Sequence, residues 1–174
     1  AALLLSVQDR QHQQVRIRCP LRKERLLIIS KQFDFYVKCL FEGIHRYYNV
    51  QSVICHSEKD YPHALLSRES FDLIITFDLA GFEQTTLMGG ISYNLLNSKF
   101  VNFLMHENLQ NEKCLSKQLS LSMFFYCAGS QYEKYLRENY PDIPYLRSLD
   151  EAASSMEVAL KTAVDEVLVE CHLR

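Results

Sequence analysis

The chain has 174 residues, of which 48% are hydrophobic and 23% are charged, a composition that is globular and excludes an intrinsically disordered protein. The length suits one domain with a genuine core and is too short for two ordinary domains. The net charge of −2 gives no reason to expect nucleic acid or an anionic membrane as a partner, and no apolar run approaches the roughly 20 residues of a membrane span.

Residues 1–25 form a basic segment with six basic and two acidic residues, so that its net charge is about +4. Its basic residues follow the apolar stretch of residues 1–7, which is the opposite order to that of a secretory signal. We expect a basic lead-in, either helical or flexible, with a partner-binding arm as the alternative. Residues 26–174 are expected to form a single α/β domain.

Five short apolar runs recur along the rest of the chain, and most of them stop at small, polar or charged residues. They are residues 26–29, 52–55, 73–77, 100–105 and 123–127. Continuous apolar strands that are separated by helix-length segments predict a parallel sheet covered on both faces. The fold class is therefore a three-layer Rossmann-like or flavodoxin-like domain with a mainly parallel sheet of five or six strands. The sixth strand would lie at an edge, at residues 143–146, where Pro144 is tolerated.

Helices are expected between these strands. Apolar residues at steps of three and four predict one over residues 33–48, and a short one is expected near residues 62–67. Capping-box patterns place two more helix starts at Ser130 and Ser148, the second opening a long C-terminal helix. That last helix is expected to pack on the parent sheet, with another subunit as the alternative. Paired glycines in residues 79–99 indicate a loop that carries a short helix.

The six cysteines have no CxxC pair, and at least two of them lie inside predicted buried strands. A helix-covered sheet does not need disulfides, so we interpret the cysteines as reduced core thiols of a cytoplasmic protein.

In a parallel sheet, ligands bind outside the carboxyl ends of the strands, where the polar residues that follow each run would gather. Asp78 follows the third strand and is suited to bind a hydroxyl or act as a base, although an Asp at this place is also a routine helix cap. His106 and Glu107 end the fourth strand, and His106 is suited to general-base catalysis. These three residues are the catalytic candidates.

Further residues near the same edge are candidate ligand contacts: Ser30, Lys31, His56, Gly81, Glu83, Gly129 and Ser130. Lys31 could neutralise a phosphate held near the following helix, although the usual glycines are missing there. Ser130 already has an explanation as a helix cap.

Several motifs are absent from the sequence. It contains no GxGxxG after the first strand, no GxxxxGK[ST] and no GxSxG, and no Cys/His spacing resembles a zinc site. We therefore predict neither a cofactor nor a metal. The ten Tyr and ten Phe follow the core periodicity and do not form a basic stacking surface, which disfavours nucleic-acid binding.

Three segments together resemble the N-terminal, acceptor-side half of GT-B glycosyltransferases: Phe71–Asp78, Lys99–Glu107 and Ser122–Leu136. In that family a buried strand ending near a histidine is followed by a strand ending in serine and a short helix. The resemblance implies a domain that binds a small molecule or a nucleotide sugar. Because the chain has no room for the donor-side half, catalysis would need a partner.

The stretch Asp72–Ile75 leading toward an aspartate also resembles a receiver domain. Phe77 holds the expected phosphoacceptor position, and Asp78 comes one residue late. Ser30 and Lys31 replace the acidic pair after the first strand, and residues 127–129 lack the usual lysine. The resemblance therefore implies a degenerate, non-phosphorylated relative.

Three functions stay open at this point. The first is a domain that binds a nucleotide sugar or another small polar ligand. The second is a non-catalytic module that docks on a protein partner or forms a homodimer through its C-terminal helix or basic N-terminus. The third is a degenerate receiver-like signalling domain. They differ in what they require: a polar cavity at the strand ends, an exposed apolar patch, or an acidic cleft beside Asp78.

Overall fold

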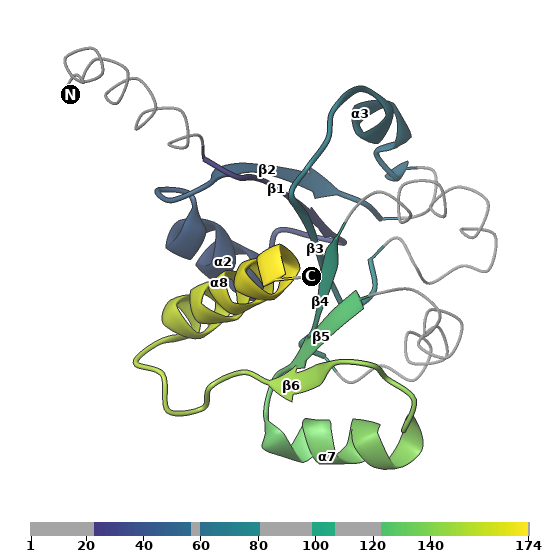
Figure 1. Ribbon diagram of the computed structural model, residues 1–174, viewed down its shortest axis with the longest axis vertical. Coiled ribbons are helices and arrows are strands. Elements are labelled where there is room, and N and C mark those ends of the chain that lie inside the picture. Colours follow the sequence, from purple (N-terminus) through teal and green to yellow (C-terminus); the bar gives the residue numbers. More distant parts are fainter. Residues whose placement is uncertain (1–22, 57–59, 81–98, 107–122, 174) are drawn as a thin grey trace, which may run out of the picture.

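A computed structural model describes residues 23–56, 60–80, 99–106 and 123–173. Its centre is a six-stranded parallel sheet with the strand order β2-β1-β3-β4-β5-β6 (Figure 1). The strands are β1 (Arg25–Ser30), β2 (Asn49–Ile54), β3 (Leu73–Phe77), β4 (Phe100–Leu104), β5 (Met123–Cys127) and β6 (Leu146–Ser148). The predicted parallel α/β fold with five or six strands is confirmed.

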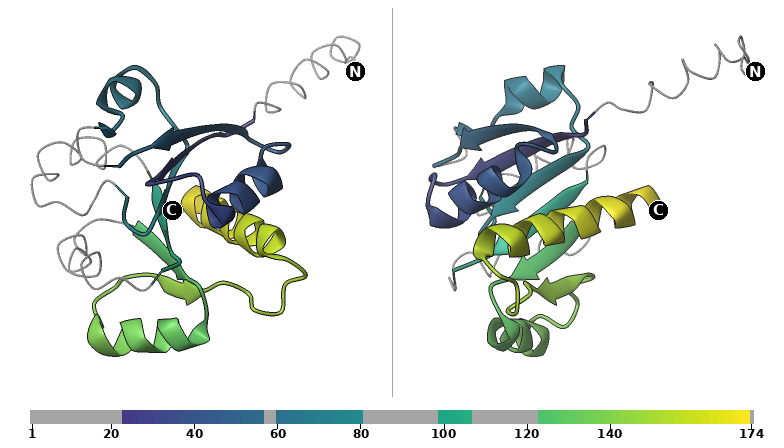
Figure 2. Two further views of the ribbon diagram at one scale, coloured as in Figure 1. Left: turned by 180° about the vertical axis from the view of Figure 1, so that it is seen from behind. Right: turned by 90° about the vertical axis from the view of Figure 1, so that its left-hand side faces the viewer.

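Four described helices cover the two faces of this sheet: α2 (Phe35–Ile44), α3 (His63–Arg68), α7 (Ser130–Asn139) and α8 (Met156–Leu173). Helices α2 and α8 lie side by side on one face, and α3 and α7 lie on the other (Figures 1 and 2). Two apolar clusters correspond to these faces, one packed under each pair of helices. The arrangement is the three-layer fold expected from the sequence.

The central strands are buried on both faces, which explains their continuous apolar sequences. Every residue of β3 and β4 is buried, and Phe100, Phe103 and Phe125 are among the largest side chains with almost no exposed surface. Strand β2 is the edge strand beside β1, and each of its residues is exposed or half-buried. This difference follows from the strand order, because one side of β2 has no neighbouring strand.

Helix α2 begins later than the periodicity predicts, because Asp34 is its N-cap. The Asp34 carboxylate accepts a hydrogen bond of 3.1 Å from the backbone N–H of Val37. Phe33 therefore precedes the helix and is exposed, and the helix ends at Ile44 instead of continuing to Tyr48. A capping carboxylate fixes the helix start more strongly than one further apolar residue does.

Helix α7 begins at Ser130 as expected, but the predicted capping box does not form. The N-cap is Gly129, and the Ser130 hydroxyl donates to Oε1 of Glu151 at 3.1 Å. Glu133 pairs with Arg137 instead of reaching back to the helix start. A carboxylate from the later loop therefore stabilises the positive end of this helix.

The C-terminal helix does not begin at the second predicted capping box. Ser148 is the last residue of β6, where it pairs with Cys127 of β5. Helix α8 begins at Met156, and the hydroxyl of Ser155 accepts from the N–H of Val158 at 3.2 Å. Pairing with β5 keeps Ser148 extended, so the helix starts later in the chain, directly after Ser155. It packs on the parent sheet, as expected.

Two tyrosines tie α8 to the rest of this face. Tyr48 donates to Asp165 at 2.6 Å, and Tyr126 of β5 donates to Glu166 at 3.0 Å. Burial is the main cause that raises the pKa of both phenols, and the carboxylate acceptors raise it further. Both phenols therefore stay protonated at neutral pH and serve as donors.

Four described cysteines are free thiols: Cys55 and Cys127 are buried, and Cys39 and Cys171 are half-buried. This agrees with their interpretation as reduced thiols near the core. Among the described helices, none is both long enough and apolar enough to cross a membrane. The basic lead-in up to residue 22 and most of the predicted loop at residues 79–99 lie outside the described residues.

Candidate functional site

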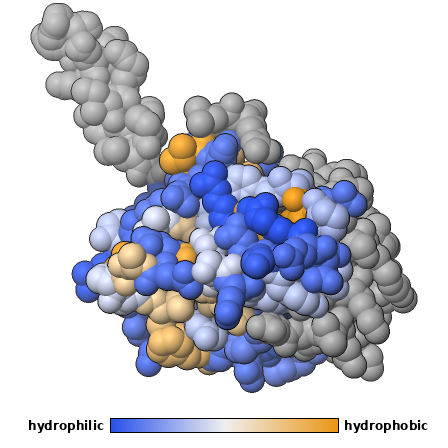
Figure 3. Space-filling model, turned by 90° about the horizontal axis from the view of Figure 1, so that it is seen from below, coloured by the Kyte–Doolittle hydropathy of each residue, from blue (hydrophilic) through white to orange (hydrophobic). Residues whose placement is uncertain are grey.

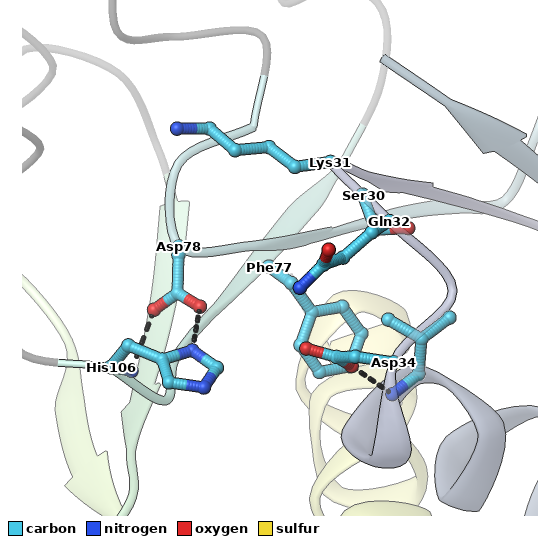
Figure 4. A pocket seen from close by; sticks show the side chains of 8 residues that line it. Ser30, Lys31, Gln32, Asp34, Phe77, Asp78 and His106 are labelled. Atoms are coloured by element: carbon cyan, nitrogen blue, oxygen red, sulfur yellow. Dashed lines mark hydrogen bonds and ion pairs between the residues drawn. The ribbon is translucent and has the colours of Figure 1, made fainter. Parts of the chain in front are cut away.

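Three neighbouring strands end at the same place and enclose a cavity of about 210 Å³ (Figure 4). Because β1, β3 and β4 are adjacent and parallel, their carboxyl ends lie side by side. The strand order also reverses between β1 and β3, the position at which open α/β sheets bind ligands. The cavity is lined by residues of these strand ends and of the start of α2: Ser30, Lys31, Gln32, Asp34, Val37, Phe77, Asp78 and His106.

Asp78 and His106 are in direct contact. Oδ1 of Asp78 accepts from the backbone N–H groups of Met105 and His106 at 2.8 and 2.9 Å. Oδ2 accepts from Nδ1 of the His106 ring at 2.8 Å (Figure 4). Because a carboxylate only accepts, Nδ1 carries the proton, and in the neutral ring Nε2 is then an acceptor. The Tyr36 ring packs against the imidazole in a T-shaped contact, with ring centroids 5.4 Å apart, which further fixes the orientation of the imidazole.

The turn after β3 has a backbone conformation that side chains seldom adopt. Asp78 and Leu79 have φ values of 51° and 62°, in the left-handed region. A buried amide supports this turn: Oδ1 of Asn102 accepts from the N–H of Leu79 at 3.3 Å, and its Nδ2 donates to the Thr76 hydroxyl. Left-handed residues cost free energy and persist only where such contacts hold them, which marks this turn as a constrained element.

Ser30 is a buried polar residue in the lining of the cavity. It is 1% exposed, and its hydroxyl has no hydrogen-bond partner among the described residues. Its backbone carbonyl accepts from Cys55, so the main chain here is paired although the side chain is not. Buried hydroxyls are nearly always hydrogen-bonded, and an exception calls for a physical explanation.

The β1–α2 connection supplies the remaining polar groups. Asp34 faces the cavity while one of its oxygens caps α2. The side chain of Lys31 extends away from Asp34, so its ammonium group does not lie against that carboxylate (Figure 4). The predicted phosphate site at the start of this helix is therefore unfavourable, because a carboxylate occupies the position that an anion would take.

The other candidate residues are not part of this cavity. His56 is an exposed residue after the edge strand β2. Gly129 and Ser130 lie after the end of β5, where Glu151 accepts hydrogen bonds from Ser130. The candidates Gly81, Glu83 and Glu107 lie outside the described residues.

The described groups suit proton exchange or polar binding better than metal binding. The Asp78–His106 pair orients an imidazole as in general-base sites. No three His, Cys, Asp or Glu side chains gather into a metal-binding group in the described part of the chain. Cys127 does not offer a nucleophile, because burial is the main cause that raises the pKa of its thiol to about 12.

Sequence reasoning missed three polar residues that shape this site. The first is Asp34, and its position just before an apolar helix, which is typical of an N-cap, is the signal that could have identified it. Thr76 and Asn102 each interrupt an apolar strand, and both are fully buried. A polar residue in the middle of a buried strand signals an internal hydrogen bond, and that signal could have identified this pair.

No family model matches the sequence, and no curated protein matches it. Among solved structures, the chain is similar to the signal receiver domain of an HD domain-containing protein from Pseudomonas fluorescens Pf-5, with 14% identity and a TM-score of 0.52 over 88% of this chain and all of that one. It also matches the signal receiver domain of a LuxO repressor protein from Vibrio parahaemolyticus, with 15% identity and a TM-score of 0.48 over 87% of this chain and 94% of that one. An identity of 14% shows only that the chain shares an α/β fold with the first of these structures.

Proposed function

We propose that this chain is a receiver-like signalling domain that works without phosphorylation. The observation that carries the proposal is the set of hydrogen bonds that the carboxylate of Asp78 accepts. This carboxylate comes directly after β3, one residue later than the position at which a receiver would be phosphorylated, and it already accepts three hydrogen bonds from the end of β4. Hydrogen bonds lower the nucleophilicity of a carboxylate oxygen, and here both oxygens accept from groups at the end of β4.

The residue before Asp78 supports the same conclusion. Phe77 occupies the last position of β3, is 5% exposed and stacks on Phe103 of β4 with ring centroids 5.3 Å apart. The chain thus has an apolar ring where the receiver resemblance expects the reactive carboxylate. This ring stabilises the sheet and offers no acceptor oxygen.

The end of β1 also lacks the groups that phosphotransfer requires. Receivers use an acidic pair after this strand to hold a divalent cation, whose preferred ligands are carboxylate and carbonyl oxygens. Ser30 and Lys31 stand there instead, and a lysine adds positive charge beside the place of the cation. Strand β5 ends in Cys127 and is followed by Ala128 and Gly129, without a lysine to contact the phosphoryl group.

The test is to incubate the protein with acetyl phosphate and Mg²⁺ and to measure its intact mass. A receiver domain known to autophosphorylate under these conditions serves as the positive control. We expect the control to gain a phosphoryl group and this chain to gain none. Light scattering in the same samples should give an unchanged oligomeric state.

The matched variant is Asp78→Asn, which removes the one carboxylate at the end of β3. A phosphoryl adduct on the wild type that disappears in this variant would identify Asp78 as an acceptor and contradict the proposal. An oligomeric state that changes with acetyl phosphate would contradict it as well.

A docking module that uses a broad apolar surface is the second candidate. Hydrophilic residues cover most of the face shown in Figure 3, and the hydrophobic ones lie in small patches. The exposed large apolar residues are spread over several elements: Phe33, Phe35, Tyr47, Ile54, Val158 and Val169. This dispersal favours the signalling proposal over a hydrophobic docking face. The glycosyltransferase interpretation has no support from the comparisons and stays a prediction.

A further inference from the structure

The outer side of β2 is a feature that the signalling proposal does not use. Strand β2 lies at one edge of the sheet, and no strand pairs with its outer side in the part of the chain that the structure describes (Figure 1). It keeps one continuous register with β1 and contains neither a charged residue nor a proline. Bulges, charges and prolines are the devices by which natural proteins block an edge strand. Strand β2 therefore has the character of an edge that accepts a further strand.

The ladder with β1 shows which main-chain groups of β2 lie on its outer side. The N–H of Asn49 donates to the carbonyl of Glu24, and the N–H of Cys55 donates to that of Ser30. Because successive residues of a strand direct their main-chain groups to opposite sides, the odd-numbered residues of β2 face β1. The residues that direct one donor and one acceptor outward are Val50, Ser52 and Ile54.

We propose that this edge binds the same edge of a second copy of the chain, with the two β2 strands antiparallel about a twofold axis at Ser52. In this register each outward residue lies opposite an outward residue of the partner, so that all their main-chain groups pair. Val50 lies opposite the partner's Ile54, and the two serines meet at the centre, so each pair matches in character. Because β2 is uncharged, identical strands approach without repulsion. The inference goes beyond the proposed function, because it needs no phosphoryl chemistry.

Helix α2 carries an aromatic row on the flank that is turned toward this edge. Gly43 marks the opposite flank, which packs against α8, since a Cβ there would lie 3.0 Å from the backbone oxygen of Glu157. Phe41 and His45 lie two residues before and after Gly43 and hence roughly opposite to it around the helix. Their rings stack with centroids 5.5 Å apart, and the half-exposed ring of Phe33 packs on Phe41 at 6.3 Å. Helix α2 lies between α8 and β2 (Figure 1), so this aromatic row faces the β2 side.

The aromatic row favours a second copy over an unrelated extended peptide. A twofold axis perpendicular to the sheet keeps α2 of both copies on the same face, where one aromatic row lies beside the other above the joined strands. An extended peptide would pair with β2 but would leave this row uncovered. The contact consists of main-chain hydrogen bonds and a narrow row of rings, so it needs no broad apolar surface. We expect weak, reversible association, as is typical of small interfaces.

The experiment is sedimentation velocity on the full chain over a wide concentration range, with hydrogen exchange of the β2 amides measured by NMR at both extremes. We expect a reversible equilibrium between monomer and dimer. The amides of Val50, Ser52 and Ile54 should exchange more slowly at high concentration, because they donate to the partner strand. The amides of Gln51 and Val53 face β1 and are the internal reference, whose exchange should change much less. This measurement tests the interface in the wild type without any variant.

The decisive variants are Ser52→Lys and Ser52→Glu, each of which places like charges opposite each other across the twofold axis. Either one should weaken dimerisation about tenfold or more, and an equimolar mixture of the two should restore it, because opposite charges then meet. The matched control is Ser154→Lys, the same change at an exposed position in the loop before α8, and it should dimerise like the wild type. Circular dichroism verifies folding, which a charge on an exposed edge strand leaves intact.

Three outcomes would overturn the inference. The first is a wild type that stays monomeric at every concentration, and slow exchange of the outward amides in that monomer would assign the edge to another segment of the same chain. The second is unchanged dimerisation of both Ser52 variants, which would place the interface elsewhere. The third is a mixture that associates no better than the single variants, which would exclude the antiparallel register. The acetyl phosphate experiment reads a covalent adduct, so the two proposals can fail separately.

Discussion

One carboxylate, that of Asp78, binds both the backbone and the ring of His106. The backbone N–H of His106 donates to Oδ1 and the ring Nδ1 donates to Oδ2, so the histidine is held at two points. Asp78 follows β3 and His106 follows β4, and the contact therefore joins the ends of two adjacent strands. The side chain of Asp78 is only 16% exposed, which protects these bonds from competition by water.

We expect Asp78→Ala to destabilise the protein by about 2–4 kcal/mol, because three donors lose a charged acceptor and each such bond contributes about 1.5–3 kcal/mol before relaxation. Asp78→Asn should cost less, because an amide oxygen still accepts and Asn tolerates the left-handed backbone at this position. Urea unfolding followed by circular dichroism measures both changes.

Asp142→Asn is the control for these variants, because Asp142 is exposed in the loop before β6. Its stability should stay within about 0.5 kcal/mol of the wild type. A free energy of unfolding for Asp78→Ala that equals that of the control would show that the Asp78 contacts contribute nothing to stability.

Glu151 is expected to stabilise α7 from a distant loop. Its carboxylate accepts from the hydroxyl and the N–H of Ser130 at the start of the helix. Glu151→Ala should lower the free energy of unfolding by about 1 kcal/mol, as the loss of an N-cap does. Glu138→Ala, an exposed change in the same helix, should be close to neutral. Equal stability of the two variants would contradict a capping role for Glu151.

The close approach of α2 and α8 depends on Gly43. A Cβ atom at this position would lie 3.0 Å from the backbone oxygen of Glu157 and 3.1 Å from its Cγ. Alanine favours a helix by about 1 kcal/mol over glycine, but overpacking against a rigid backbone costs about 1–3 kcal/mol. We therefore expect Gly43→Ala to lower the thermal midpoint despite the better propensity.

Lys38→Ala is the control for this change, since Lys38 is exposed on the same helix and should show nearly unchanged stability. If Gly43→Ala were the more stable of the two, the helices would have room to separate and the packing argument would be wrong.

The sequence predicts the sheet well because strands that are buried on both faces are short apolar segments, which can be recognised without knowing any distant contact. The central strands are apolar runs, broken only by Thr76 in β3 and Asn102 in β4, and the helix-length spacing between runs favours the crossover connections that parallel strands need. The same logic predicts that the polar residues after β3 and β4 lie at one edge. The structure brings Asp78 and His106 together there.

The contacts themselves could not be predicted, because they join residues that are distant in the chain. The capping-box pattern at Ser148 ends a strand, whereas Ser155, which has no such pattern, accepts from the first turn of the helix. Pairing of β6 with β5 decides whether Ser148 caps a helix or ends a strand. That pairing depends on tertiary structure, which the local sequence does not show. Likewise, nothing near Ser130 in sequence indicates that Glu151 would be its partner.

The last prediction concerns alkaline pH and Cys127. Burial, aided by the charge of Glu133, raises the pKa of this thiol from 9.0 to about 12 in the folded protein. The unfolded chain therefore loses the proton first, so the stabilising contribution is complete below pH 9 and is lost as the pH rises from 9 toward 12. Stability should fall over this window by up to about 1.4 kcal/mol per pH unit for this one group.

Cys127→Ala should flatten that decline, although it lowers stability at neutral pH by leaving a small cavity. Cys39→Ala is the comparison, because the pKa of Cys39 is also raised but its side chain is only half-buried. Urea unfolding at several pH values between about 8 and 10 is the suitable measurement, since the buried tyrosines contribute in the same direction only above pH 10. A decline of equal slope in the wild type and the Cys127→Ala variant would mean that ionisation of this thiol does not limit the alkaline stability of the fold.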